Sequence, residues 1–204
     1  MKIALIGATG FVGTPLLDEA VERGHSVTAI ARNTESIRLN KHIHPVQIDI
    51  NEDKDKLVQT LKGHDVVISS VHFTDFDQEQ IIHAVKEAEV PRYLVVGGAG
   101  GLEVSPGLSL LETDDFPEKF KEEAEAGVEF LNKLKQEKHL KWTFLSPSAN
   151  FTPGEKTGHF RVGGKKLLRN EEGKSEINVG DFAVAMMNEA EKPKHIQQRF
   201  TVGY

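Results

Sequence analysis

The chain has 204 residues and a formal net charge of −6, and its basic residues are scattered, which argues against a non-specific nucleic-acid surface. It contains no cysteine, so disulfide frameworks, thiolate nucleophiles and thiolate metal sites are excluded. No apolar run approaches the ~20 residues of a membrane helix and the first residues lack a signal-peptide pattern, so we expect a cytoplasmic protein with no membrane partner.

Apolar runs alternate with amphipathic stretches over the first 147 residues, which is typical of parallel βα units. The runs predict strands at 2–7, 26–31, 44–50, 65–71, 92–98 and 140–147. The amphipathic stretches predict helices at 12–24, 53–63, 77–90 and 117–137. Right-handed crossovers would stack these elements into an α/β, Rossmann-type doubly wound parallel sheet.

The rhythm changes after residue 147. Residues 160–179 predict a hairpin that turns at 170–173, and Asp181 is expected to cap a helix over 182–191 before a last strand at 198–203. These elements are too few to fold alone. We therefore expect a single domain, 1–204, in which about 148–204 contribute a small C-terminal substrate lobe.

Three glycines, Gly7, Gly10 and Gly13, stand between the first strand and the first helix. Glycines at this spacing permit a tight turn and let a pyrophosphate approach the backbone at the positive end of a helix. An ordinary βα turn is the alternative, but the strand before and the helix after are the context that a dinucleotide motif requires.

Arg32 follows the second strand, where an NAD site usually carries Asp or Glu for the ribose 2′-hydroxyl. Its planar guanidinium suits a 2′-phosphate, and the alternative is a surface arginine in a loop. The sequence therefore favours NADP over NAD.

The ends of the third and fourth strands add further candidates. Asp49 is placed to accept from the adenine amine beside Ile50, and Ser69, Ser70 and Val71 reach the same carboxyl edge of the sheet, where ligands bind. For Asp49 and Ser70, hydrogen bonding within the strand ends is an equally good interpretation.

Longer motifs resemble an atypical short-chain dehydrogenase/reductase: GATGFVG, ARN, DI, VVGGAGGLEV, DDFP, WTFLSPSANFTPGEKTG and RFTVGY. Within that superfamily the chain is similar to the NAD(P)-binding group that includes proteins described as NADH-flavin reductases and, more distantly, biliverdin reductase B and the NmrA-like proteins. The resemblance implies dinucleotide phosphates at Thr9, Gly10, Phe11 and Val12, the 2′-phosphate at Arg32 and adenine at Asp49 and Ile50. It places the nicotinamide near Ser70 to His72, near Gly97, Gly98 and Ala99, and near Pro147 to Ala149.

The Tyr-x-x-x-Lys pair of better-known short-chain dehydrogenases is absent. The helix that should carry it has Phe116 and Phe120, and the chain's two tyrosines are Tyr93, inside a strand, and Tyr204, its last residue. Hydride transfer to a carbonyl makes an alkoxide that needs a positioned acid, whereas a reduced flavin or quinone is a delocalised anion that solvent can protonate.

We therefore expect an NADP-dependent oxidoreductase that reduces a small planar acceptor such as a flavin or quinone. The alternative is an NADP(H)-binding redox sensor that regulates a partner without catalysis. His72 and Ser148 are the candidate proton donors, although a solvated loop histidine and a turn-capping serine are equally good interpretations. No metal site is expected, because His42 and His44 lack a third ligand.

Overall fold

The computed structural model describes residues 1–204, apart from the side chain of Gln78. Its centre is an 8-stranded sheet in the order β10-β12-β8-β5-β4-β1-β2-β3, parallel throughout except for the antiparallel edge strand β10. The strands are β1 (Lys2–Ile6), β2 (Ser26–Ala31), β3 (Ile43–Gln47), β4 (Val66–Ser69), β5 (Arg92–Val96), β8 (Trp142–Ser146), β10 (Arg161–Gly163) and β12 (Gln198–Gly203).

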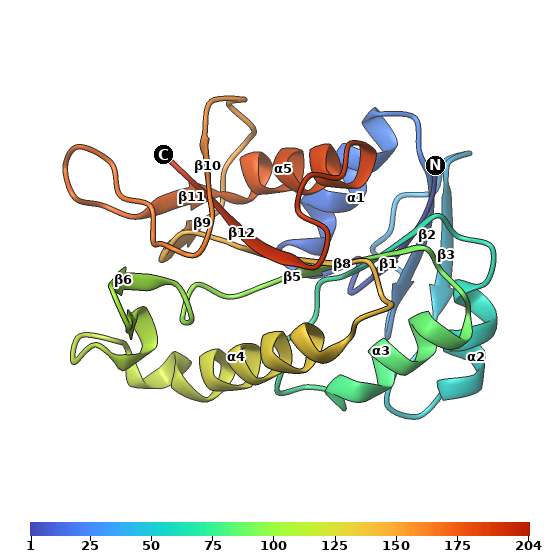
Figure 1. Cartoon of the computed structure of the whole chain (residues 1–204). Helices are drawn as coiled ribbons and strands as arrows, with labels where there is room; N and C mark the ends of the chain where they lie inside the picture. The colour runs from blue at the N-terminus through green and yellow to red at the C-terminus, as the bar shows by residue number, and fades with distance from the viewer.

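Helices cover both faces of this sheet, as Figure 1 shows. One face carries α1 (Gly13–Glu22) and α5 (Val179–Glu191), and the other carries α2 (Lys54–Leu61), α3 (Gln78–Glu87) and α4 (Lys121–Gln136). The expected doubly wound Rossmann-type sheet is confirmed. The chain reverses its direction across the sheet between β1 and β4, and in such sheets ligands bind at that switch point.

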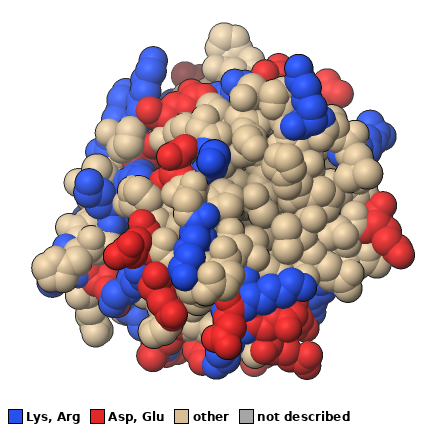
Figure 2. Space-filling model, turned by 90° about the vertical axis from the view of Figure 1, so that its right-hand side faces the viewer, with Lys and Arg blue, Asp and Glu red and all other residues tan. Residues whose placement is uncertain are grey.

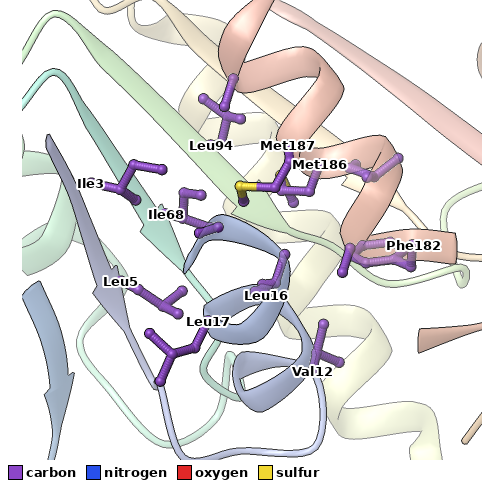
Figure 3. Packing of buried hydrophobic residues seen from close by; sticks show 14 of the residues in the cluster. Ile3, Leu5, Val12, Leu16, Leu17, Ile68, Leu94, Phe182, Met186 and Met187 are labelled. Atoms are coloured by element: carbon purple, nitrogen blue, oxygen red, sulfur yellow. The ribbon is translucent and has the colours of Figure 1, made fainter. Parts of the chain in front are cut away.

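The two faces of β1 explain why its sequence is continuously apolar. Ile3 and Leu5 pack into the cluster beneath α1 and α5, whereas Ala4 and Ile6 pack into the cluster beneath α2, α3 and α4. Figure 3 shows the first cluster, in which Leu16 of α1 and Met187 of α5 lie near Ile68 of β4. This double burial holds the glycine-containing turn after β1 on a rigid support.

The C-terminal segment differs from the predicted hairpin. The turn is present, since the amide of Gly173 donates to the carbonyl of Asn170 over 2.9 Å, but the two arms do not pair with each other. β10 pairs with β12, and β11 (Glu176–Asn178) pairs in parallel with β9 (Asn150–Thr152). The hairpin prediction was wrong because each arm finds a distant strand instead of its neighbour along the chain.

Asp181 fastens this segment instead of capping α5 as predicted. The N-cap is Asn178, whose side chain accepts from the amide of Asp181 over 2.8 Å. Asp181 itself is fully buried and accepts from both the amide and the hydroxyl of Thr157, from the amide of Gly158 and from the hydroxyl of Tyr204. Burial would raise the pKa of Asp181, but these hydrogen bonds outweigh it and hold the pKa below its ordinary value.

The same segment is also tied to α1 by an ion pair. Nζ of Lys156 lies 2.8 Å from Oε2 of Glu19 and 2.8 Å from Oε1 of Glu22. The loop after β9 is therefore held against α1, the helix that follows the glycine-containing turn.

Residues 99–116 contain the short antiparallel pair β6 (Glu103–Ser105) and β7 (Leu108–Ser109), followed by a 3-10 turn, η1 (Leu110–Glu112). Glu112 serves this 3-10 turn and not the long helix that follows. Its carboxylate accepts from the amide and the hydroxyl of Ser109 and thereby closes a capping box on η1. A second 3-10 turn, η2 (Glu118–Phe120), precedes α4.

The outer edge of the sheet at β3 carries a proline. The amide of Val27 donates to the carbonyl of His42, and the amide of Ile48 donates to the carbonyl of Ala31. The backbone N–H and C=O groups at even-numbered positions of β3 therefore point towards β2. Pro45 is at an odd-numbered position, so its backbone nitrogen and carbonyl point away from β2, towards the open edge of the sheet.

Acidic and basic side chains are interspersed on the face shown in Figure 2, beside a broad uncharged area. Among the residues described, no helix combines the length and the apolar character needed to cross a bilayer.

Candidate functional site

Two glycines of the turn after β1 are required by the protein's own backbone. Gly7 has φ +83°, and a Cβ built on it would lie 2.1 Å from the carbonyl oxygen of Ser70. A Cβ on Gly13 would lie 1.9 Å from the carbonyl oxygen of Gly7. These glycines let β1, β4 and the start of α1 approach one another closely.

Gly10 has a different role. A Cβ built there would meet only the carbonyl oxygens of Gly7 at 3.4 Å and Ser70 at 3.9 Å, which are ordinary contacts. Gly10 lines a cleft, so such a Cβ would fill space that the turn leaves open to a ligand. The N-cap of α1, Val12, makes no side-chain capping bond, and the first turn of that helix carries no acidic residue. This cradle therefore fits the diphosphate of a dinucleotide.

The cleft has a volume of about 310 Å³ and lies at the carboxyl ends of β1, β2, β3 and β4. It brings together most of the candidates expected from these four strand ends: Gly7, Thr9, Gly10, Arg32, Asp49, Ile50, Ser70, Val71 and His72. Its apolar lining is Ile6, Ile30, Ile48, Ile50, Val71 and Phe76. A slot with apolar walls and polar groups at its rim suits a planar base attached to a charged sugar phosphate.

Arg32 lies in this cleft just beyond the end of β2, with an exposed side chain. Across the described part of the chain, no salt bridge involves its guanidinium. The nearest carboxylate in sequence, Glu35, accepts instead from the side-chain amide of Asn33 at 3.4 Å. The donors of Arg32 are thus available to a phosphate group in the cleft.

The end of β3 is held in place by its own hydrogen bonds. Oδ1 of Asp49 accepts from the amide of Asn51 over 3.0 Å, and the carbonyl of Ile50 accepts from the side-chain amide of Gln80 on α3. The side-chain amide of Asn51 donates to the carbonyl of Asp75 over 2.8 Å, which joins this end to the loop after β4. The loops after β3 and β4, which flank the cleft, are therefore fixed to one another.

Among the candidates near the ends of β1 and β4, three have side chains outside the cleft. Ser69 is buried, and its hydroxyl is 2.9 Å from that of Tyr93 in the core. Val12 packs into the cluster beneath α1 and α5. Phe11 is 54% exposed and meets Phe151 of β9 edge-to-face, with ring centroids 5.7 Å apart. For Ser69 and Val12, which are buried, contact with a dinucleotide would have to come from backbone groups.

Of the positions expected near a nicotinamide, Ser70 to His72 line the cleft, whereas those that follow β5 and β8, the next strands along the sheet edge, are not among its lining. A Cβ on Gly97 would lie 2.1 Å from the ring of Phe144, whereas one on Gly98 would meet nothing within 4 Å. Gly97 is therefore needed for packing, and Gly98 leaves open space beside it. Ala99 is half-buried and Pro147 is buried.

The two candidate proton donors have different surroundings. Ser148 is 1% exposed, and its hydroxyl donates to the carbonyl of Val202 over 2.9 Å, a geometry that favours packing over catalysis. His72 lines the cleft, and its side chain is 77% exposed. Its Nδ1 lies 3.4 Å from Oε1 of Glu123 in the first turn of α4.

Sequence reasoning missed Glu123 because an acidic residue in a first turn is already explained by the helix dipole. Its contacts cross to another element and could not be read from its neighbours along the chain. Within the described residues, no group of three or more His, Cys, Asp or Glu side chains is arranged to hold a metal ion.

Comparison with known proteins agrees with this geometry. Residues 7–190 match a family model described as NAD(P)H-binding. The chain is 36% identical to the uncharacterised protein YwnB of Bacillus subtilis, over 99% of this chain and 98% of that protein.

Solved structures give the same assignment. A "putative epimerase" from Bacteroides thetaiotaomicron is 44% identical with a TM-score of 0.94, and the match covers 100% of this chain and 96% of that one. A "putative NADH-flavin reductase" from Streptococcus pneumoniae is 36% identical with a TM-score of 0.87, covering 100% and 99% of the two chains. Together with the glycine cradle and the cleft at the strand ends, these matches show that the chain belongs to the NAD(P)H-binding family of atypical short-chain dehydrogenase/reductase-like proteins.

Proposed function

We propose that this protein is an NADP-dependent oxidoreductase that passes hydride to a small planar acceptor, such as a flavin or a quinone. The preference for NADP depends chiefly on Arg32, an exposed arginine in the cleft at the place where an NAD site carries a carboxylate. Because the side chain is free of salt bridges within the described residues, its fork is available to a 2′-phosphate.

The absence of a tyrosine acid supports a planar acceptor. Burial raises the pKa of Tyr93, whose hydroxyl is engaged with Ser69. Tyr204 donates to Asp181 and has a pKa raised to about 12, first by burial and then by that carboxylate. Neither phenol lines the cleft, which favours an acceptor whose reduced form can be protonated without a tyrosine.

In this proposal the bound cofactor supplies the hydride, and the chain supplies binding and orientation. The turn at Gly10 and the N-terminus of α1 hold the diphosphate, and Arg32 holds the 2′-phosphate. Gly98 leaves room for the acceptor at the end of β5. A held geometry can contribute up to ~7–11 kcal/mol to such a reaction. The relative named as an NADH-flavin reductase supports a flavin as the first acceptor to test.

The test is anaerobic oxidation of NADPH by the purified protein with FMN, with NADH in parallel and menadione as a second acceptor. We expect turnover above the protein-free rate that is faster with NADPH than with NADH. No turnover with either acceptor, in protein shown by titration to bind NADPH, would contradict the reductase and favour a regulatory NADP(H) sensor.

A further inference from the structure

His72 and Glu123 join the loop after β4 to the first turn of α4 at the rim of the cleft. We propose that His72 is the proton donor of the reaction and that Glu123 is a positioning residue that orients its imidazole. This inference rests on the proposed reductase function, and it adds the group that delivers the proton after hydride transfer.

The carboxylate of Glu123 has a fixed position. Its Oε1 accepts from the amide of Phe73 over 2.8 Å, and its Oε2 accepts from the amide and the hydroxyl of Thr74 over 3.1 and 2.9 Å. Phe73 is itself anchored, because its ring stacks on that of Phe144 with centroids 6.0 Å apart and packs on Phe130 at 5.4 Å. Both sides of the junction are therefore held by contacts other than His72.

His72 lies beside this fixed carboxylate. Its Nδ1 is 3.4 Å from Oε1 of Glu123, and its side chain is 77% exposed in the lining of the cleft. Since the two nitrogens of an imidazole point in divergent directions, Nε2 is turned away from Glu123. Asp75, on the same loop as His72, also lines the cleft. The residue on another element with which His72 forms an ion pair is Glu123.

This arrangement has the order that proton transfer requires: a carboxylate, then Nδ1, then Nε2, which has no hydrogen-bond partner among the described side chains. The acceptor gains a hydride, with its electron pair, from the reduced nicotinamide. The Nε2–H bond of the His72 imidazolium then breaks, and its proton bonds to a nitrogen or oxygen of the reduced acceptor. The imidazole left behind is neutral, keeps its proton on Nδ1 towards Glu123, and regains the Nε2 proton from solvent at its exposed face.

The chain offers a matched control pair. His83 on α3 lies 3.4 Å from Glu87, and its side chain is 78% exposed, so distance and exposure equal those of the proposed pair. His83 is not among the residues lining the cleft. His83→Gln therefore removes an equivalent histidine from outside the proposed site.

The first readout needs no activity. Nitrogen-15 shifts of the histidine rings in the ligand-free protein, above neutral pH, report which nitrogen carries the proton. We expect His72 to be mainly the Nδ1–H tautomer and to lose this preference in Glu123→Gln, while His83 is unchanged. A wild-type His72 that is mainly Nε2–H would overturn the orienting role of Glu123.

The second readout is the pH dependence of kcat with NADPH and menadione. The wild-type kcat should fall as pH rises, because the donor must hold its proton. His72→Gln should lower kcat at neutral pH by about 10²-fold, the low end for a positioned acid because solvent competes with it, and should abolish that fall. His83→Gln should match the wild type.

Thr74→Val separates the orientation of His72 by Glu123 from the anchoring of the loop after β4. It removes the hydrogen bond from the Thr74 hydroxyl to Glu123 and keeps the carboxylate beside His72. We expect Glu123→Gln to change the pH profile and Thr74→Val to leave the shape of the profile unchanged. Wild-type turnover that His72→Gln leaves intact would overturn this inference alone. Absence of wild-type turnover would overturn the proposed function and the inference with it.

Discussion

The hydroxyl of Tyr204 donates a hydrogen bond to Oδ2 of Asp181 over 2.8 Å and so joins the last residue of the chain to the first turn of α5. Hydrogen bonding of this kind lowers the pKa of the acceptor and raises that of the donor. The pKa of Asp181 is accordingly held low, and that of Tyr204 is raised. The two shifts predict opposite dependences of stability on pH.

At acid pH we predict that Asp181 limits stability. A carboxyl whose folded pKa is depressed stabilises the fold above its unfolded pKa, and this contribution is lost as pH falls through the folded value, below about pH 4. Asp181→Asn should lower the free energy of unfolding at neutral pH by about 2–3 kcal/mol, because an amide cannot accept from all the donors. In urea titrations the difference in the free energy of unfolding between Asp181→Asn and the wild type should become smaller below about pH 4. Asp18→Asn, at an exposed position of α1, is the control and should have little effect at any pH.

At alkaline pH we predict the opposite contribution from Tyr204. Its folded pKa of about 12 lies above the ordinary value of 10.0, so the folded state keeps a proton that the unfolded state releases. The free energy of unfolding should therefore fall as pH rises above about 10, and it should fall less steeply in Tyr204→Phe than in the wild type. Urea unfolding between about pH 8 and about pH 11 measures both curves. Parallel curves would contradict the raised pKa, and the slope that remains in the variant is expected from Tyr93.

Gly10→Ala and Gly13→Ala should separate ligand binding from folding. A Cβ at Gly10 meets only ordinary contacts within the protein, so we expect a melting temperature near that of the wild type and at least about tenfold weaker NADPH binding, equivalent to ~1.4 kcal/mol. At Gly13 the Cβ would lie 1.9 Å from a backbone oxygen, and stability should fall by about 1–3 kcal/mol or more. Thermal melts and fluorescence titration with NADPH test both variants. Gly164→Ala, where a Cβ would meet nothing within 4 Å, is the control.

Arg32→Ala should weaken NADPH binding and leave NADH binding nearly unchanged. Charge-assisted hydrogen bonds contribute about 1.5–3 kcal/mol, so the Kd for NADPH should rise about 10- to 150-fold. Arg38→Ala removes the same charge from an exposed position that is not among the cleft lining. Equal losses in the two variants would point to general electrostatic attraction, and no loss in Arg32→Ala would contradict the 2′-phosphate assignment.

Local patterns in the sequence were enough to predict the first half of the fold and the cleft. Gly10, Arg32 and Asp49 follow the first three strands of the sheet, and parallel strands place all their carboxyl ends at one edge. Their convergence therefore follows from chain order alone. The hydrophobic periods that mark these strands and helices are local properties of the sequence.

The rest depended on contacts between residues far apart in the chain. Glu123 holds the loop at Phe73 from 50 positions away, and Lys156 reaches Glu19 across 137 positions. Neither polar side chain belongs to a periodic pattern that could reveal its partner. The arms of the expected hairpin pair with β9 and β12, and no local signal distinguishes that pairing from a pairing with each other.

Pro45 affects how this molecule meets other copies of itself. An edge strand with an unbroken row of amide donors is a template to which another chain can add, and repeated addition leads to aggregation. At Pro45 that row is interrupted in the middle of β3, on the side that faces away from β2, because proline has no N–H to offer. Pro45 thus disfavours the addition of another strand to this edge of the sheet, and with it self-association through β3.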